Sequence, residues 1–78
     1  MDWEQIDSIA EHLFQDSIRR VKQKLKDLDP KEREKVARKI AMREVNAWLK
    51  GNYGVDWPYV KAKITAKEMD QSIDDLAV

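Results

Sequence analysis

The sequence predicts an all-α protein, a small helical bundle with two long helices as an antiparallel hairpin plus two short C-terminal helices. Apolar residues recur mostly every three or four positions, and no segment shows the alternation of a β-strand. Only two glycines and two prolines interrupt the 78 residues. We expect one domain, residues 1–78, because a chain of this length holds a single core.

The first long helix is expected to begin near Trp3 and to run to Leu28. Asp2 followed by Gln5 resembles a capping box, and Asp29-Pro30 both ends this helix and starts the next. The apolar positions that follow helical spacing are Trp3, Ile6, Ala10, Leu13, Phe14, Val21, Leu25 and Leu28. The polar Ser17 fills the gap in this series.

The length of this helix raises the question of what covers it. About 26 residues span about 39 Å, whereas a compact chain of this size is roughly 30 Å across. We therefore expect either a kink near Ser17 or a second subunit. A small chain also has difficulty building a sufficient core alone, so self-association is predicted.

The second long helix is expected from Pro30 to about Lys50, with Gly51 as its C-terminal stop. Its apolar residues cover more than one side, which is typical of a central helix or one shared with a partner chain. Asp56-Trp57-Pro58 predicts a short third helix from Trp57 to Ile64. Thr65 and Glu68 form a second capping box, which predicts a last helix from Thr65 to Leu76.

The formal net charge of zero hides three charge blocks. Residues 1–17 sum to −5, residues 18–67 to +9 and residues 68–78 to −4. Acids precede bases in both long helices, the order that complements a helix macrodipole. Three pairs at i, i+4 put the acid first: Asp16–Arg20, Asp29–Arg33 and Glu34–Arg38. These effects leave an acid-free basic run, Arg19 to Lys26, unexplained. Two first helices paired antiparallel would set acidic halves against basic halves.

The sequence argues against an enzyme. Ser8, His12 and Asp16 share one helical stripe, but an exposed stripe lacks the buried base and the oxyanion hole that a triad needs. With one His and no Cys, no transition-metal set is complete. The acidic tail lacks the glycine-containing loop of a calcium site, and no phosphate loop follows a strand. We expect neither a metal nor a cofactor.

The chain is expected to be cytoplasmic. No run approaches the roughly 18 apolar residues of a membrane span, and the acidic start, Met-Asp-Trp-Glu, does not resemble a signal peptide. The sequence favours a stand-alone accessory protein of bacterial or phage type.

The favoured function is a protein-interaction module that acts as a regulator, inhibitor or adaptor, as a homodimer. Four aromatic residues fall within twelve positions around the Gly51–Gly54 turn, and Trp and Tyr are enriched at binding hot spots. In the competing interpretation Trp48 and Trp57 pack on each other as a small core. Trp3 is expected to join the first helix to the last. The predicted partner-binding residues are Arg19, Lys22, Lys26, Arg38, Arg43, Tyr53, Trp57 and Tyr59.

The alternative is a DNA-binding regulator of helix-turn-helix type. The basic helices supply phosphate contacts, and residues 54–63 would enter a groove after the Gly51–Gly54 turn. An extra glycine in the turn and the bulk of Trp57, Pro58 and Tyr59 count against this motif.

Overall fold

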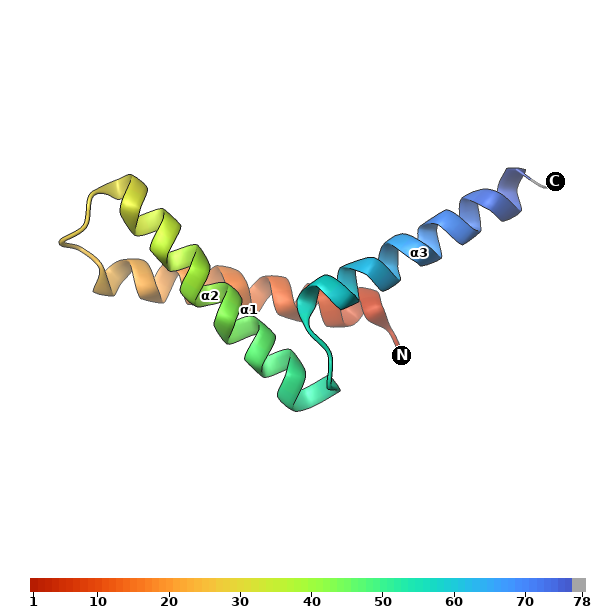
Figure 1. Ribbon diagram of the computed structural model, residues 1–78, viewed down its shortest axis with the longest axis horizontal. Helices are drawn as coiled ribbons and strands as arrows, with labels where there is room; N and C mark the ends of the chain where they lie inside the picture. Colours follow the sequence, from red (N-terminus) through yellow and green to blue (C-terminus); the bar gives the residue numbers. More distant parts are fainter. Residues whose placement is uncertain (77–78) are drawn as a thin grey trace.

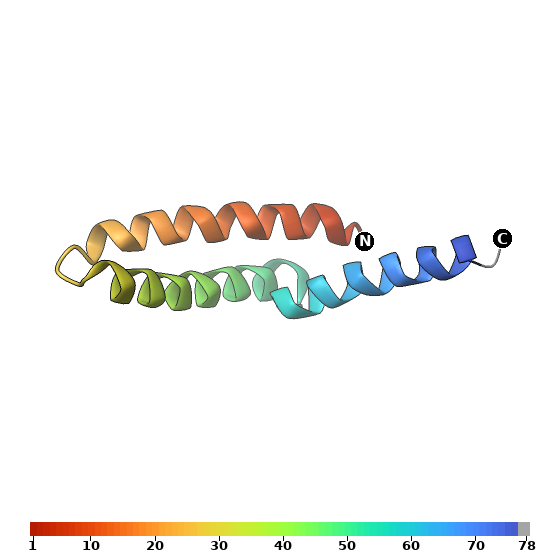
Figure 2. The same cartoon turned by 90° about the horizontal axis from the view of Figure 1, so that it is seen from above.

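The computed structural model describes residues 1–76, and this part of the chain folds into three helices with no strand. These are α1 (Trp3–Lys24), α2 (Pro30–Tyr53) and α3 (Trp57–Leu76). The turned view in Figure 2 shows α1 and α2 side by side in opposite directions, with α3 continuing past the N-terminal end of α1. The all-α prediction is confirmed.

Each helix begins at an aspartate that caps its first turn, as the sequence indicates. Asp2, Asp29 and Asp56 each accept a backbone N–H from two or three residues later, at 3.2, 2.8 and 3.0 Å. A carboxylate in this position satisfies a donor that lacks a partner within the helix. Pro30 is the first residue of α2, where no N–H is needed.

The predicted extension of α1 to Leu28 is wrong, because the helix ends at Lys24. Leu25 leaves helical geometry, and its N–H bonds to the Val21 and Lys22 carbonyls. The chain then reverses direction through residues 26–29, as the loop at the left of Figure 2 shows. The helical spacing of apolar residues thus continues beyond the end of α1 into this turn, and the turn brings α2 back along α1.

The predicted stop of α2 at Gly51 is also displaced. The helix continues through Gly51 to Tyr53 and ends at Gly54, which has φ 71° and a left-handed conformation. The Gly54 N–H donates to the Lys50 carbonyl at 3.0 Å, which closes the last turn. Of the two glycines, Gly54 is therefore the one that the backbone requires.

Alanine substitutions at the two glycines should have opposite effects. Gly54→Ala should destabilise the fold by about 1–2 kcal/mol, because the added Cβ disfavours positive φ. Gly51→Ala should stabilise it by about 0.5–1 kcal/mol, since the position is helical and nothing lies within 4 Å of the new Cβ. Thermal unfolding of both variants measures this. Equal effects would contradict the assignment of the cap to Gly54.

The two short C-terminal helices of the prediction are one continuous helix, α3, of 20 residues. Thr65 does not cap a new helix; its hydroxyl donates to the Lys61 carbonyl at 3.0 Å, one turn earlier. Ser and Thr form this bond inside helices, so a capping-box sequence can occur without a helix start.

The core is a thin layer in which α1 faces α2, and the start of α3 completes it. Small side chains with no exposed surface, Ala10, Ala37 and Ala41, lie in this layer, together with the fully buried Leu49. No kink occurs at Ser17, because α1 is continuous and α2 lies along it. The molecule is elongated, with a radius of gyration of 16.2 Å. A compact chain of this length has about 11–12 Å. Figure 1 shows α3 leading away from the hairpin.

Candidate interaction surface

Trp57 is the residue at which the three helices meet. Its indole Nε1–H donates to Asp7 Oδ1 of α1 at 2.7 Å, and its backbone N–H donates to Asn46 Oδ1 of α2 at 2.9 Å. Its ring meets Phe14 edge-on, with centroids 5.3 Å apart. Only 2% of Trp57 is exposed, so this predicted partner-binding residue lies in the core and fixes where α3 begins.

The other aromatic rings form two further edge-on pairs. Trp48 packs against Tyr53 with centroids 5.8 Å apart, so the two tryptophans each have another ring as partner and not each other. Trp3 packs against Tyr59 at 5.7 Å and joins α1 to the first part of α3, the segment predicted as the third helix, and not to the segment predicted as the last one. Tyr59 remains 45% exposed.

Two lysines of α3 lie over aromatic rings near the start of the helix. The Lys63 ammonium is 5.3 Å from the Tyr59 ring centroid, and the Lys61 ammonium is 4.5 Å from that of Trp57. Such contacts orient a cation while leaving it accessible to an anion. We call Trp3, Tyr59 and Lys63 the Tyr59 patch. On another part of the same junction, Met42, Trp57, Pro58 and Lys61 line a shallow hollow.

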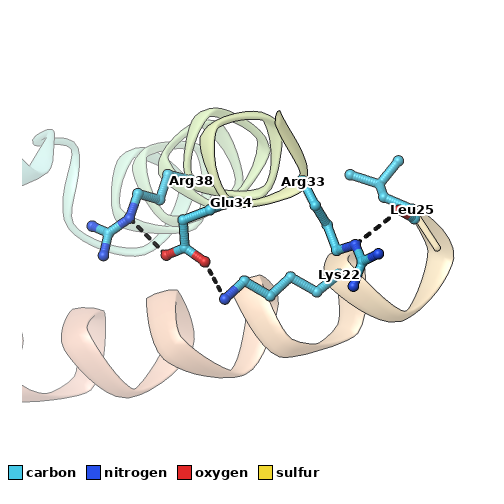
Figure 3. A network of polar contacts seen from close by, with 5 residues as sticks. All are labelled: Lys22, Leu25, Arg33, Glu34 and Arg38. Atoms are coloured by element: carbon cyan, nitrogen blue, oxygen red, sulfur yellow. Dashed lines mark hydrogen bonds and ion pairs between the residues drawn. The ribbon is translucent and has the colours of Figure 1, made fainter. Parts of the chain in front are cut away.

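Two of the predicted basic residues are held within the hairpin by one carboxylate. Glu34 of α2 accepts from Arg38 Nε at 3.0 Å and pairs with Lys22 of α1, as Figure 3 shows. Hydrogen bonds from Lys22 and then from Arg38 lower the pKa of Glu34 below its usual 4.5. Lys22 thus acts between α1 and α2, whereas Arg38 pairs with Glu34 within α2, and both charges are partly compensated.

Replacing Glu34 should remove a pH-dependent part of the stability. A carboxylate with a lowered pKa stabilises the fold above its ordinary pKa and loses this effect as the pH falls through the lowered value. Wild type should therefore be more stable than Glu34→Gln at about pH 7, and the difference should vanish as the pH falls well below 4.5. Urea unfolding across this range measures it. The exposed Glu11→Gln variant is the control, and a gap independent of pH would contradict the pairing.

Arg33 organises the turn between α1 and α2, a role that the sequence analysis missed. Its guanidinium donates to three loop carbonyls: Leu25 at 3.1 Å, Lys26 at 3.2 Å and Leu28 at 3.0 Å. Figure 3 shows it bonded to Leu25 beside the Glu34 pair. The predicted ion pair with Asp29 is absent among the described ion pairs, because the side chain reaches the loop backbone. An arginine a few residues after an Asp-Pro turn is the only signal in the sequence.

The i, i+4 pair between Asp16 and Arg20 is confirmed, and it is part of a second polar group between α1 and α2. Arg20 lies 3.4 Å from Asp16 and 3.7 Å from Glu44. The hydroxyl of Ser17, which is 1% exposed, also donates to Glu44. The gap in the apolar series of α1 thus holds a satisfied polar residue.

The eight predicted partner-binding residues do not form one surface. Arg19, Lys26 and Arg43 are exposed and belong to none of the ion pairs in the described part of the chain. Of the other five, Trp57 lies in the core, Lys22 and Arg38 pair with Glu34, and Tyr53 and Tyr59 belong to the aromatic pairs. Within this set, Tyr59 combines exposure with neighbouring aromatic and basic side chains, which makes the Tyr59 patch the candidate site.

The structure places the other sequence candidates on the surface. Ser8, His12 and Asp16 are all exposed on α1. Among the described residues, no three His, Asp or Glu side chains come together as a metal site would require. None of the described helices has an apolar stretch long enough to cross a membrane.

Comparison with protein-family models, with curated proteins and with solved structures finds no match to this chain.

Proposed function

We propose that the protein is a non-enzymatic interaction module, a regulator, inhibitor or adaptor that binds another protein and self-associates as a homodimer. The observation that supports this most is the distal part of α3. Residues 65–70 are all exposed, and Figure 1 shows this part of the helix leading away from the hairpin. A helical segment shorter than about 12–15 residues is only marginally stable in water without packing. A partner that packs on the distal part of α3 would therefore stabilise it.

The Tyr59 patch is the proposed contact for the other protein. Tyr and Trp supply rigid apolar area with a polar tip, and the adjacent Lys63 offers a cation. An apolar segment that carries Asp or Glu fits this chemistry. The scaffold is rigid at this point because Trp57 anchors the start of α3 two residues before Tyr59.

Affinity capture from a lysate of the source cells tests this function. Tyr59→Ala and Lys63→Glu should each lose the protein that wild type retains, whereas Lys35→Ala, an exposed change on α2 outside the predicted partner-binding residues, should keep it. Both side chains are at the surface, so the variants should stay folded, which circular dichroism checks. Equal retention of the same protein by all four would contradict the assignment.

DNA binding is the second candidate, and one observation favours it. Lys61, Lys63 and Lys67 are all exposed on α3, the helix that follows a short turn after α2. Phosphate binding by such lysines would shift a random duplex at about 50 mM salt and disappear by about 200 mM. We expect no shift under either condition. A salt-sensitive shift that Lys61→Glu and Lys67→Glu abolish would favour DNA over a protein partner.

A further inference from the structure

The hollow where α2 meets the start of α3 is mostly apolar and opens to the surface. Met42 of α2 lines it together with Trp57, Pro58 and Lys61 of α3, and its volume is about 160 Å³. The Trp57 indole N–H already donates to Asp7, and Met42 is 40% exposed. A cavity of about 150 Å³ can hold a benzene-sized group, so this hollow fits one side chain of the size of Phe or Leu.

Two exposed lysines lie beside this hollow. Lys61 lines it, and its ammonium is held 4.5 Å from the centroid of the Trp57 ring. Lys39 precedes Met42 by three residues, which makes the two side chains neighbours on the surface of α2. Neither lysine belongs to an ion pair in the described part of the chain. Both cations are therefore available to an anionic group that approaches the hollow.

The basic run of α2 beside the hollow works against the stability of its own helix. Residues 35–43 hold four bases and no acid: Lys35, Arg38, Lys39 and Arg43. Lys39 and Arg43 are like charges at i, i+4, an arrangement that destabilises a helix. The acids on either side of the run, Glu34 and Glu44, pair with other side chains. A carboxylate supplied by a partner would relieve this repulsion.

The acids near the start of α3 do not supply that carboxylate either. Asp7 and Asp56 accept hydrogen bonds from the Trp57 indole and the Tyr59 backbone. The next acid of α3 after Lys61 is Glu68, seven residues and about 10 Å further along the helix axis. None of the four residues that line the hollow is acidic. An apolar hollow beside two cations is complementary to an apolar side chain between carboxylates.

We propose that this hollow receives one large apolar side chain of an acidic segment of the partner protein, whose carboxylates pair with Lys39 and Lys61. This inference rests on the proposed function and adds to it an anchoring pocket and the charge of the partner. An apolar anchor that fills a pocket is typical of a binding hot spot. Pro58 adjoins Tyr59, so a segment that crosses the start of α3 can contact both the hollow and the Tyr59 patch. Lys35, a further turn from Met42, lies outside the proposed contact.

A defined peptide tests the pocket without knowledge of the partner. The probe is a capped peptide in which one Phe stands between two pairs of Glu, titrated into the full chain and followed by NMR. The Met42 methyl and Trp57 indole N–H signals should shift and saturate with a Kd of roughly 0.1–1 mM. Two control peptides, one with Ser in place of Phe and one with Lys in place of each Glu, should bind at least tenfold more weakly.

Three protein variants test the residues. Lys39→Glu and Met42→Gln should each weaken binding of the Phe peptide roughly fivefold, since an exposed ion pair is worth up to about that factor. Lys24→Glu, the same charge reversal at the far end of α1, should bind like wild type. All three side chains are exposed, so the variants should stay folded, which circular dichroism checks.

Three results would overturn the proposal: equal binding of the Phe and Ser peptides, unchanged affinity in both Lys39→Glu and Met42→Gln, or no shift with the Phe peptide up to about 5 mM. A random DNA duplex that shifts the Met42 methyl signal as strongly as the peptide would also overturn it, in favour of phosphate binding.

The lysate capture separates failure of this inference from failure of the proposed function. Met42→Gln should lose the captured protein as Tyr59→Ala does. If Met42→Gln keeps a protein that Tyr59→Ala loses, this inference is wrong and the interaction module stands. If the Phe peptide binds as described and wild type captures no protein, the pocket stands and the proposed function is wrong.

Discussion

Trp57→Ala should abolish or nearly abolish folding. The substitution removes a side chain that is 2% exposed, the edge-on contact with Phe14 and the bond to Asp7. Truncating a buried Trp costs about 3–5 kcal/mol, and a core of this size rarely supplies more than about 3–5 kcal/mol in total. Circular dichroism with urea unfolding should show a variant that is largely unfolded without denaturant.

A milder pair of variants keeps this prediction testable if Trp57→Ala does not fold. Trp57→Phe retains a ring against Phe14 but loses the indole donor and part of the buried ring volume, so it should cost about 1–2 kcal/mol, less than Trp57→Ala. Asp7→Asn keeps an acceptor at the same place and should cost less than about 1 kcal/mol. A Trp57→Phe variant as stable as wild type would show that the bond to Asp7 does not hold α3 on the hairpin.

Leu49→Ala should have the second-largest effect, a loss of about 2–5 kcal/mol. Leu49 has no exposed surface and lies in the core cluster between the helices. Its truncation leaves a cavity in the core. Urea unfolding measures the change as a lower midpoint with an unchanged slope.

The same chemical change at Leu28 is the control for Leu49→Ala. Leu28 is 38% exposed in the turn after α1, so Leu28→Ala should stay within about 0.5 kcal/mol of wild type. Similar losses at both positions would contradict the location of the core. They would also indicate that the apolar series of α1 extends to Leu28 as a buried stripe.

The three helix starts could be predicted from the sequence because their causes are local, although a similar motif at Thr65 also predicted a start that does not occur. Asp2, Asp29 and Asp56 act on N–H groups within three residues, and the chain carries that information in short motifs. The helix ends could not, because they depend on distant contacts. The end of α1 involves Arg33 from the next helix, and nothing nearby distinguishes Gly51 from Gly54 as a cap.

The candidate site could likewise be predicted only in part from the sequence. The sequence indicates which residues are basic or aromatic, and Tyr59 and Trp3 are found in this manner. It does not show that Glu34 holds Lys22 across the helices, or that Trp57 reaches Asp7 fifty positions away. The Asn46 acceptor has no sequence signal that we recognise. Charge and aromaticity are properties of single residues, whereas exposure is a property of the packed chain.

Amide hydrogen exchange at different protein concentrations tests the central claim, that the distal part of α3 finds its partner outside its own chain. Residues 65–70 should exchange quickly at about 1 µM and become clearly protected near about 500 µM, as expected for binding by mass action. Residues 6–18 of α1, which hold the core, should be equally protected at both concentrations. Identical protection of residues 65–70 at the two concentrations would contradict the account.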